Sequence, residues 1–238
     1  MADFNIGPQH RDLVEEVRAL AREKIAPRAG ELDEKGDLHF DFGPVQTLAE
    51  NNLLTPTVPV EYGGRGLGYF PTALLLEELG AACAGVATVV AANIHAASPL
   101  ILAGTGLQRE TFLSSLAAGR PNLAAFALTE SQSGSDIAAI ATLAGKVNGH
   151  WEISGVKDCV INGGVAHFTT LFAATDLQNI KAGMMAFIVP EDTPGLRVGA
   201  VRQKLGIRYA RTAQLILEKA VVSGDLAIGP KGGAYLLL

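Results

Sequence analysis

The spacing of apolar residues changes near Pro121, and this change limits the possible folds more than any other feature of the chain. Before Pro121, apolar residues recur every three to four positions, as on one face of a helix. Pro44 and Pro71 stand where a helix can begin, because proline fits the first helical turn. We therefore predict a compact helical domain, with helices at 8–28, 45–51, 72–82, 86–102 and 107–118.

Beyond Pro121 the predicted segments are shorter, and turn residues separate them. Asn148-Gly149 lies between two of these segments and is the strongest short-range hairpin signal that a sequence can give. About 100 residues organised in this way are typical of an antiparallel barrel or sandwich. The predicted strands lie at 122–128, 139–147, 151–156, 167–175, 184–189, 196–201 and 214–218.

Together the two patterns predict an α+β multidomain protein, in which an N-terminal all-α helical domain (residues 1–120) precedes an antiparallel β-barrel domain (residues 121–230). Residues 231–238 end in Tyr235-Leu236-Leu237-Leu238, an unusually apolar tail. We expect this tail to begin a missing further domain or to dock against another chain. Only 18% of the residues are charged, below the roughly 25% of an average soluble domain, which also favours a surface covered by a partner.

Composition argues against several classes of protein. The net charge is −5 and the 19 lysine and arginine residues are dispersed, so no basic stripe indicates nucleic-acid binding. Cys83 and Cys159 form no CxxC pair, which argues against a disulfide framework or a zinc site and favours a reducing cytoplasm. No apolar signal-peptide core follows Met1. The histidines have no metal-ligand spacing, so we interpret all five as surface or internally satisfied residues: His10, His39, His95, His150 and His167.

One uncharged segment, 79–108, is long enough to cross a bilayer. However, Asn93, His95, Ser98 and Pro99 lie in its middle, and its flanks lack aromatic belts and Lys/Arg clusters. We therefore predict a helix buried on all sides, with no membrane span.

Two polar segments carry the chemical interest of the second half. Phe126–Asp136 leaves a predicted strand and enters a loop dense in hydroxyl groups, where Gly134 allows close approach of the backbone. Such a loop suits anionic oxygens or the polar edge of a ring, and an ordinary hydroxyl-rich turn is the alternative. Gly155–Gly164 follows, and its Asn162-Gly163-Gly164 by itself indicates a tight turn and no more.

The order and spacing of these two segments, ALTExxxGSD and then G-x-K-x-x-x-x-N-G-G, resemble the middle-domain signature of the acyl-CoA dehydrogenase family. The resemblance extends in both directions and covers essentially the whole chain. Its other landmarks are Glu61–Gly68, Glu77–Leu79, Phe187–Pro190, Thr193–Gly195, Lys204–Arg208 and Gly229–Gly233.

This resemblance implies a flavoprotein that removes hydrogens from Cα and Cβ of an acyl-CoA thioester, with FAD as its cofactor. By the same matching, Leu128 and Thr129 meet the isoalloxazine ring, and Cys159–Ile161 covers the other side of that ring. Ser135 is expected to serve both the FAD phosphates and the pantetheine arm of the substrate. The full set of cofactor-binding residues implied is Phe126, Leu128, Thr129, Gly134, Ser135, Cys159, Val160 and Ile161.

The chain departs from the family pattern at Cys159-Val160-Ile161, where the family usually has Trp-x-Thr. Loss of the aromatic plane forfeits contact worth on the order of 2–4 kcal/mol, and Ile161 cannot donate the hydroxyl hydrogen bond that the family aims at flavin N5. The family's catalytic base belongs to a C-terminal helical domain, and no residue of this chain is assigned to that role. We expect no turnover by the chain alone.

Several hypotheses follow from these departures. The first is one subunit of a split acyl-CoA dehydrogenase, in which a second polypeptide supplies the C-terminal helical domain and an electron-transfer flavoprotein accepts the electrons. The second is a non-catalytic structural or regulatory subunit that has lost FAD. A truncated fragment of a full-length enzyme and an acyl-CoA oxidase are the remaining alternatives.

Overall fold

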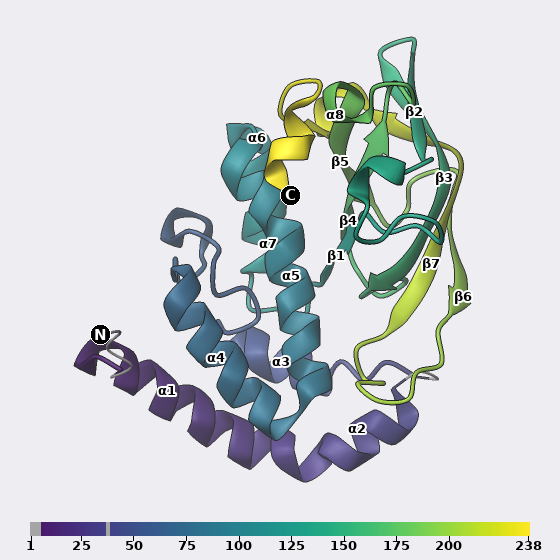
Figure 1. The fold of residues 1–238 in the computed structure, drawn as a ribbon. Coiled ribbons are helices and arrows are strands. Elements are labelled where there is room, and N and C mark those ends of the chain that lie inside the picture. Colours follow the sequence, from purple (N-terminus) through teal and green to yellow (C-terminus); the bar gives the residue numbers. More distant parts are fainter. Residues whose placement is uncertain (1–5, 37–38) are drawn as a thin grey trace.

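The helical part of the protein follows the predicted pattern closely. The structure, a computed structural model, describes residues 6–36 and 39–238 (Figure 1). The predicted helix at 8–28 is helical throughout, but turns at 21–28 separate two α-helices, because the pattern of hydrogen bonds changes there. The α-helices of this part are α1 (Pro8–Leu20), α2 (Ala29–Lys35), α3 (Gly43–Glu50), α4 (Tyr69–Ala82), α5 (Ala84–Ala103), α6 (Gly106–Gln108) and α7 (Ser114–Leu116).

The second half forms one eight-stranded sheet in the order β6-β7-β3-β2-β4-β5-β8, with β1 paired to β4. Every predicted strand is present, and the two-residue β8 and the short helix α8 (Ile180–Gly183) are additional. The strands are β1 (Ala124–Ala127), β2 (Leu143–Val147), β3 (His150–Ile161), β4 (Phe168–Ala174), β5 (Met184–Pro190), β6 (Leu196–Val201), β7 (Thr212–Ser223) and β8 (Ala227–Ile228).

The observed sheet differs from the predicted antiparallel β-barrel in two respects. In the described part of the chain the sheet is open, because β8 at one end is too short to offer a ladder to β6 at the other. The sheet is also mixed, since β4 runs parallel to β1 and its last residue pairs with the first residue of β2 in the same sense. The predicted hairpin is confirmed: β2 and β3 pair antiparallel, and Asn148 and Gly149 both have the positive φ that a two-residue turn of this kind requires.

Helix α5 joins the two halves of the molecule. It lies beside β1, between the other helices and the sheet (Figure 1). The backbone N–H of Ala124 donates to Oδ1 of buried Asn93 at 2.8 Å, and Nδ2 of buried Asn162 donates to the carbonyl of Ala124 at 2.9 Å. Both hydrophobic core clusters contain residues from helices and from strands. The division between residues 120 and 121 therefore separates helices from strands, and a domain boundary at this point stays a prediction.

Helix α5 lies within the uncharged segment 79–108, which is long enough to cross a bilayer. In the described residues it alone is long and apolar enough for one, with a mean hydropathy of 1.7. More than half of that window is buried inside the protein, which is the behaviour of a core helix. The prediction of burial on all sides is wrong for one face, since His95 and Leu102 are exposed there.

Candidate functional site

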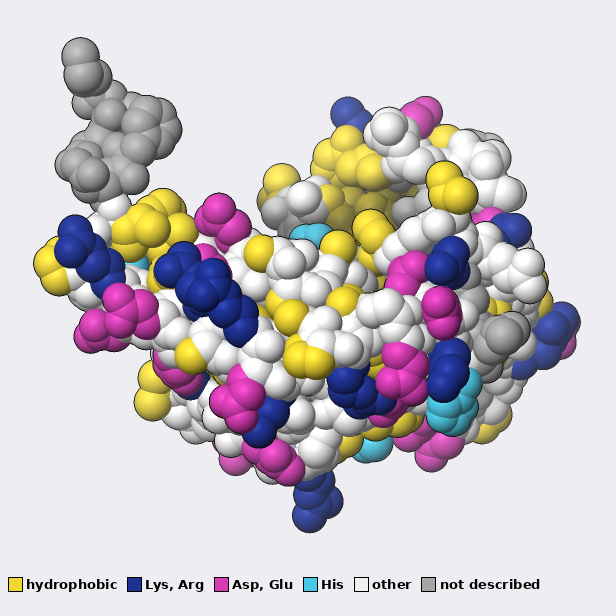
Figure 2. Space-filling view, turned by 90° about the horizontal axis from the view of Figure 1, so that it is seen from below, with side chains coloured by type: hydrophobic (Ala, Val, Ile, Leu, Met, Phe, Trp, Pro, Cys, Tyr) yellow, Lys and Arg dark blue, Asp and Glu magenta, His cyan; other side chains and the backbone are white. Residues whose placement is uncertain are grey.

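The exposed face of α5 borders a cavity of about 730 Å³. His95, Ser98 and Leu102 share this face because positions three, four and seven apart lie on the same side of a helix. Figure 2 shows a hollow lined with hydrophobic side chains on one face of the molecule, over which acidic and basic side chains are otherwise interspersed. The cavity is lined by Tyr69, His95, Ser98, Leu102, Phe126, Leu128, Ile137, Tyr235, Leu236, Leu237 and Leu238.

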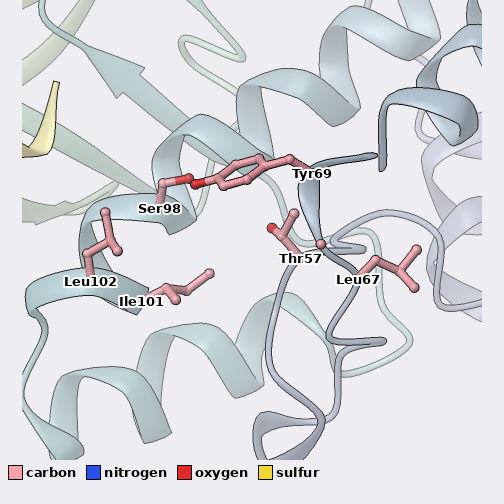
Figure 3. Close-up of a pocket in the computed structure, with 7 residues that line it drawn as sticks. Thr57, Leu67, Tyr69, Ser98, Ile101 and Leu102 are labelled. Atoms are coloured by element: carbon pink, nitrogen blue, oxygen red, sulfur yellow. The ribbon is translucent and has the colours of Figure 1, made fainter. Parts of the chain in front are cut away.

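A smaller cavity of about 170 Å³ adjoins the first one. Tyr69, Ser98 and Leu102 line both cavities, so these residues form the partition between them. Figure 3 shows the Tyr69 ring reaching across from the start of α4 with its hydroxyl group directed at Ser98 of α5. On the far side of that ring the hydroxyl of Thr57 is buried with no hydrogen-bond partner among the described residues.

The hydroxyl-rich loop begins where β1 ends, at the wall of the larger cavity. Phe126 and Leu128 line the cavity, and the Phe126 ring lies 6.1 Å from the His95 ring and 5.0 Å from the Phe172 ring. Reciprocal backbone hydrogen bonds between Glu130 and Ser133 (2.9 and 3.0 Å) close a tight turn. Gly134 and Ser135 follow on the exposed outer side, where a side chain at position 134 would meet no protein atom within 4 Å. The outer surface of the loop is therefore open to a ligand.

A buried ion pair anchors the inner side of this loop. The Lys157 ammonium donates to Glu130 Oε1 at 2.7 Å, and the side chains of these residues are 0% and 3% exposed. The carboxylate of Glu130 also accepts from the Thr142 hydroxyl at 2.6 Å and from the backbone N–H groups of Ala141 and Thr142 at 2.7 and 3.0 Å. Nε2 of Gln132 donates to the same carboxylate at 2.7 Å. Every oxygen of this buried carboxylate thus has a donor.

The ionisation of both partners follows from this geometry. Burial raises the pKa of Glu130, but the charge of Lys157 and the hydrogen bonds from Lys157, Thr142 and Ala141 outweigh it, and the pKa falls to about 2. Burial lowers the pKa of Lys157 to about 8, although its hydrogen bond and attraction to Glu130 oppose the change. Both groups are therefore charged at neutral pH.

The second predicted stretch lies directly beside the first. The N–H of Asp158 donates to the carbonyl of Thr129 at 2.8 Å, which joins the end of β1 to β3. Cys159 is exposed and has a φ of +53°, while Val160 is 1% exposed and packs into the main core. Ile161 is half-buried against the same core. The side chain of Val160 therefore has no free surface for a ligand.

The structure thus brings together most of the predicted site residues. Phe126 and Leu128 line the cavity, Thr129 contacts the strand that carries Cys159, and Gly134 and Ser135 form the exposed tip of the loop. The described parts of the chain contain no group of three histidine, cysteine, aspartate or glutamate residues able to hold a metal ion.

Sequence reasoning missed several residues of this region. The sequence predicted a surface or internally satisfied His95; it is exposed, and the structure adds that it lines the cavity. Its position in the cavity could have been inferred from the spacing of His95, Ser98 and Leu102, which places these three residues on one face of an otherwise Ala/Val-rich helix. Tyr69 had no such signal. Lys157 was visible only as a motif position, because its burial depends on contacts with the distant Leu128 and Glu130.

Comparisons with known proteins agree with this architecture. Residues 7–120 match the model of the acyl-CoA dehydrogenase N-terminal domain, and residues 125–220 match that of the acyl-CoA dehydrogenase middle domain. The chain is 37% identical over 227 residues to cyclohex-1-ene-1-carbonyl-CoA dehydrogenase of Syntrophus aciditrophicus, covering 94% of this chain and 54% of that protein.

Two solved structures extend the likeness to three dimensions. A chain from the work on the electron transferring flavoprotein of Acidaminococcus fermentans superposes with a TM-score of 0.93 at 29% identity, covering 99% of this chain and 62% of that chain. An acyl-CoA dehydrogenase complexed with FAD from Bacillus anthracis gives a TM-score of 0.87 at 29% identity, covering 100% of this chain and 40% of that chain.

The chain spans a little over half the length of the curated relatives it matches, 54% to 59%. Within that span the helices α1 to α7 lie in the residues matched by the N-terminal-domain model, and the strands β2 to β6 lie in those matched by the middle-domain model. The chain therefore belongs to the acyl-CoA dehydrogenase family, of which it carries the N-terminal and middle domains.

Proposed function

We propose that this chain forms the FAD-binding and acyl-binding part of an enzyme that dehydrogenates an acyl-CoA thioester between Cα and Cβ. One observation carries the proposal: the donor-rich loop after β1 and the apolar cavity share a wall, made by Phe126 and Leu128. A flavin ring beside that wall and an acyl group within the cavity would lie next to each other.

The residues of the loop suit FAD. Thr129 offers a hydroxyl group at the end of β1, and the exposed Gly134-Ser135 segment offers space and a hydroxyl group for phosphate oxygens. Cys159 and Ile161 would lie along the ring, although neither supplies the aromatic plane nor the hydroxyl donor of the usual family pattern. Bound FAD would accept the two electrons that leave the acyl group. The relative complexed with FAD supports the same assignment.

The cavity suits an acyl chain more than a polar ligand. Leu102, Phe126, Leu128 and Ile137 give it apolar walls, and His95 and Ser98 provide the polar groups on α5. Ser135, on the exposed side of the loop, is the residue that we assign to the pantetheine arm of the acyl-CoA.

The chemistry needs a base, which we expect to be a carboxylate side chain. No aspartate or glutamate is among the described residues that line the cavity, and abstraction of the proton at Cα requires a base within hydrogen-bond reach. We therefore propose that a C-terminal helical domain on a second polypeptide provides it, and that an electron-transfer flavoprotein takes up the electrons. The unpaired Cys83 and Cys159 suit a reducing compartment such as the cytoplasm.

Visible absorbance tests this function. The purified chain is titrated with FAD, and an acyl-CoA is then added with and without a polypeptide that carries the C-terminal domain. We expect the visible absorbance band of FAD to shift when the chain binds it. We expect this band to bleach only when the acyl-CoA and the partner are both present. A chain that leaves the spectrum of free FAD unchanged, even in its native assembly, would overturn the proposal.

A second candidate function is a subunit that keeps the fold but not the cofactor. The exposed thiol of Cys159 and the aliphatic Ile161 favour it, because the usual ring contacts are missing at both positions. A colourless complex in which the partner alone binds FAD would support this candidate instead.

A further inference from the structure

The buried Glu130–Lys157 pair has no role in the function proposed above, although it lies beneath the loop that carries that function. Burying two charges is costly, and well-packed apolar residues in their place are often as stabilising or more so. A fully buried pair at this position therefore calls for a reason other than stability.

The hydrogen bonds of Lys157 indicate that reason. Besides its bond to Glu130, the ammonium donates to the backbone carbonyl of Leu128 at 2.9 Å. The next carbonyl, that of Thr129, accepts from the N–H of Asp158 at 2.8 Å. Two successive carbonyl groups are thus held against β3, while the side chain of Leu128 lines the cavity on the other side.

We propose that Lys157 is a positioning residue for the cofactor. Its ammonium holds Leu128 and, through Glu130, the turn that follows, and so sets the direction in which Leu128 and Thr129 meet the flavin ring. This inference rests on the proposed binding of FAD.

The surroundings of the pair support a positioning role. Glu130 receives five hydrogen bonds from Lys157, Thr142, Ala141 and Gln132, so the start of the loop is tied to the segment before β2 as well as to β3. Gly155 of β3 allows Thr142 to lie this close to β3, since a Cβ at position 155 would lie 2.4 Å from the Thr142 hydroxyl. The loop is therefore held from two directions at the residue that follows Thr129.

The test uses the full chain with Lys157→Met, which keeps the aliphatic stem and removes the ammonium. We expect the dissociation constant for FAD to rise about ten- to a hundredfold, the effect of losing a charged hydrogen bond. The visible spectrum of the bound flavin should also shift, which a purely structural role would not cause. Without FAD, hydrogen exchange of residues 128–136 should become at least tenfold faster.

Two further variants keep the result interpretable. Leu48→Ala removes a fully buried side chain of α3 that lines neither cavity, so it should lower thermal stability without changing the flavin spectrum or exchange in the loop. If Lys157→Met does not fold, Glu130→Gln, which keeps the shape of the side chain, replaces it in the same measurements.

The outcomes separate this inference from the proposed function. Failure of the wild-type chain to bind FAD would count against the proposed function, and the hydrogen-exchange comparison would then decide the positioning role by itself. Unchanged exchange in the loop, or FAD bound by Lys157→Met with wild-type affinity and spectrum, would overturn the inference.

Discussion

The two stretches predicted to face the flavin are held in place by different means. The loop that begins at Leu128 is anchored by side chains, above all by the buried pair of Glu130 and Lys157. The stretch Cys159–Ile161 is shaped by its backbone. Cys159 has a positive φ value, as does Asn162, which follows the stretch. The pairing of β3 with β7 also shifts register between Lys157 and Val160. One segment depends on buried charge and the other on a β-bulge.

The bulge explains how both arrangements arise from one strand. In a regular strand alternate side chains face opposite sides, yet Lys157 and Asp158 are adjacent and both are buried. The irregularity turns Lys157 toward the loop, lets Asp158 pair with Arg202, and leaves Cys159 exposed. We therefore expect replacements on the loop side of the site to be costly and a replacement of the exposed Cys159 to be tolerated.

The largest effect is expected when the loop loses its carboxylate. Glu130→Ala leaves the ammonium of Lys157 buried without its partner, and we expect the free energy of unfolding to fall by about 3–5 kcal/mol. Urea unfolding measures this loss. Glu191→Ala, at a side chain that is 60% exposed, is the matched control and should change stability by less than about 0.5 kcal/mol. A loss below about 1 kcal/mol for Glu130→Ala would contradict the anchoring role.

The opposite side of the site can be changed toward the usual family pattern. In Cys159→Trp combined with Ile161→Thr, an indole plane and a hydroxyl donor become available to the ring. We expect FAD to bind more tightly by about 2 kcal/mol, roughly thirtyfold, as measured by fluorescence titration. Val156→Trp, an exposed position on the same strand, should leave the affinity unchanged. If Val156→Trp tightened FAD binding as much as the double variant does, Cys159 and Ile161 would not be FAD-binding residues.

The pH dependence of stability sharpens the comparison further. Because the pKa of Glu130 is lowered to about 2, its contribution to stability is present above its unfolded pKa of 4.5 and is lost as the pH falls toward 2. Between pH 6 and pH 3 the wild-type chain should lose about 2 kcal/mol that Glu130→Gln does not lose. Chemical denaturation across this range measures the difference. Parallel pH profiles for the two proteins would mean that Glu130 is not held as an anion.

The smallest effect is expected at the partition between the two cavities. Tyr69→Ala opens the larger cavity into the smaller one and removes a side chain that is 76% exposed, so stability should change little. We expect the ratio of affinities for a longer and a shorter acyl-CoA to rise roughly fivefold, because added methylene groups become buried. Calorimetric titration gives this ratio. The neighbouring Phe70→Ala, which lines neither cavity, should leave it unaltered.

Much of the fold could be read from local patterns. Helix α5 and the Asn148-Gly149 hairpin were predicted because their signals lie within a few turns of the chain. The full lengths of β3 and β7 were underestimated, since Gly155 and Lys157 look unsuited to a strand until a partner strand accommodates them. The openness of the sheet was not predicted, because closure depends on which strand edges meet, and no local pattern encodes that.

Local sequence patterns were enough to predict the order of helices and strands, the tight turns and the motif that marks the site, since each depends on residues close together in the chain. The burial of Lys157 against Leu128, the inward direction of Val160 and the position of His95 at a cavity became apparent only in three dimensions. The physical reason is that burial and charge pairing depend on neighbours brought together from distant parts of the chain, whereas backbone propensity does not.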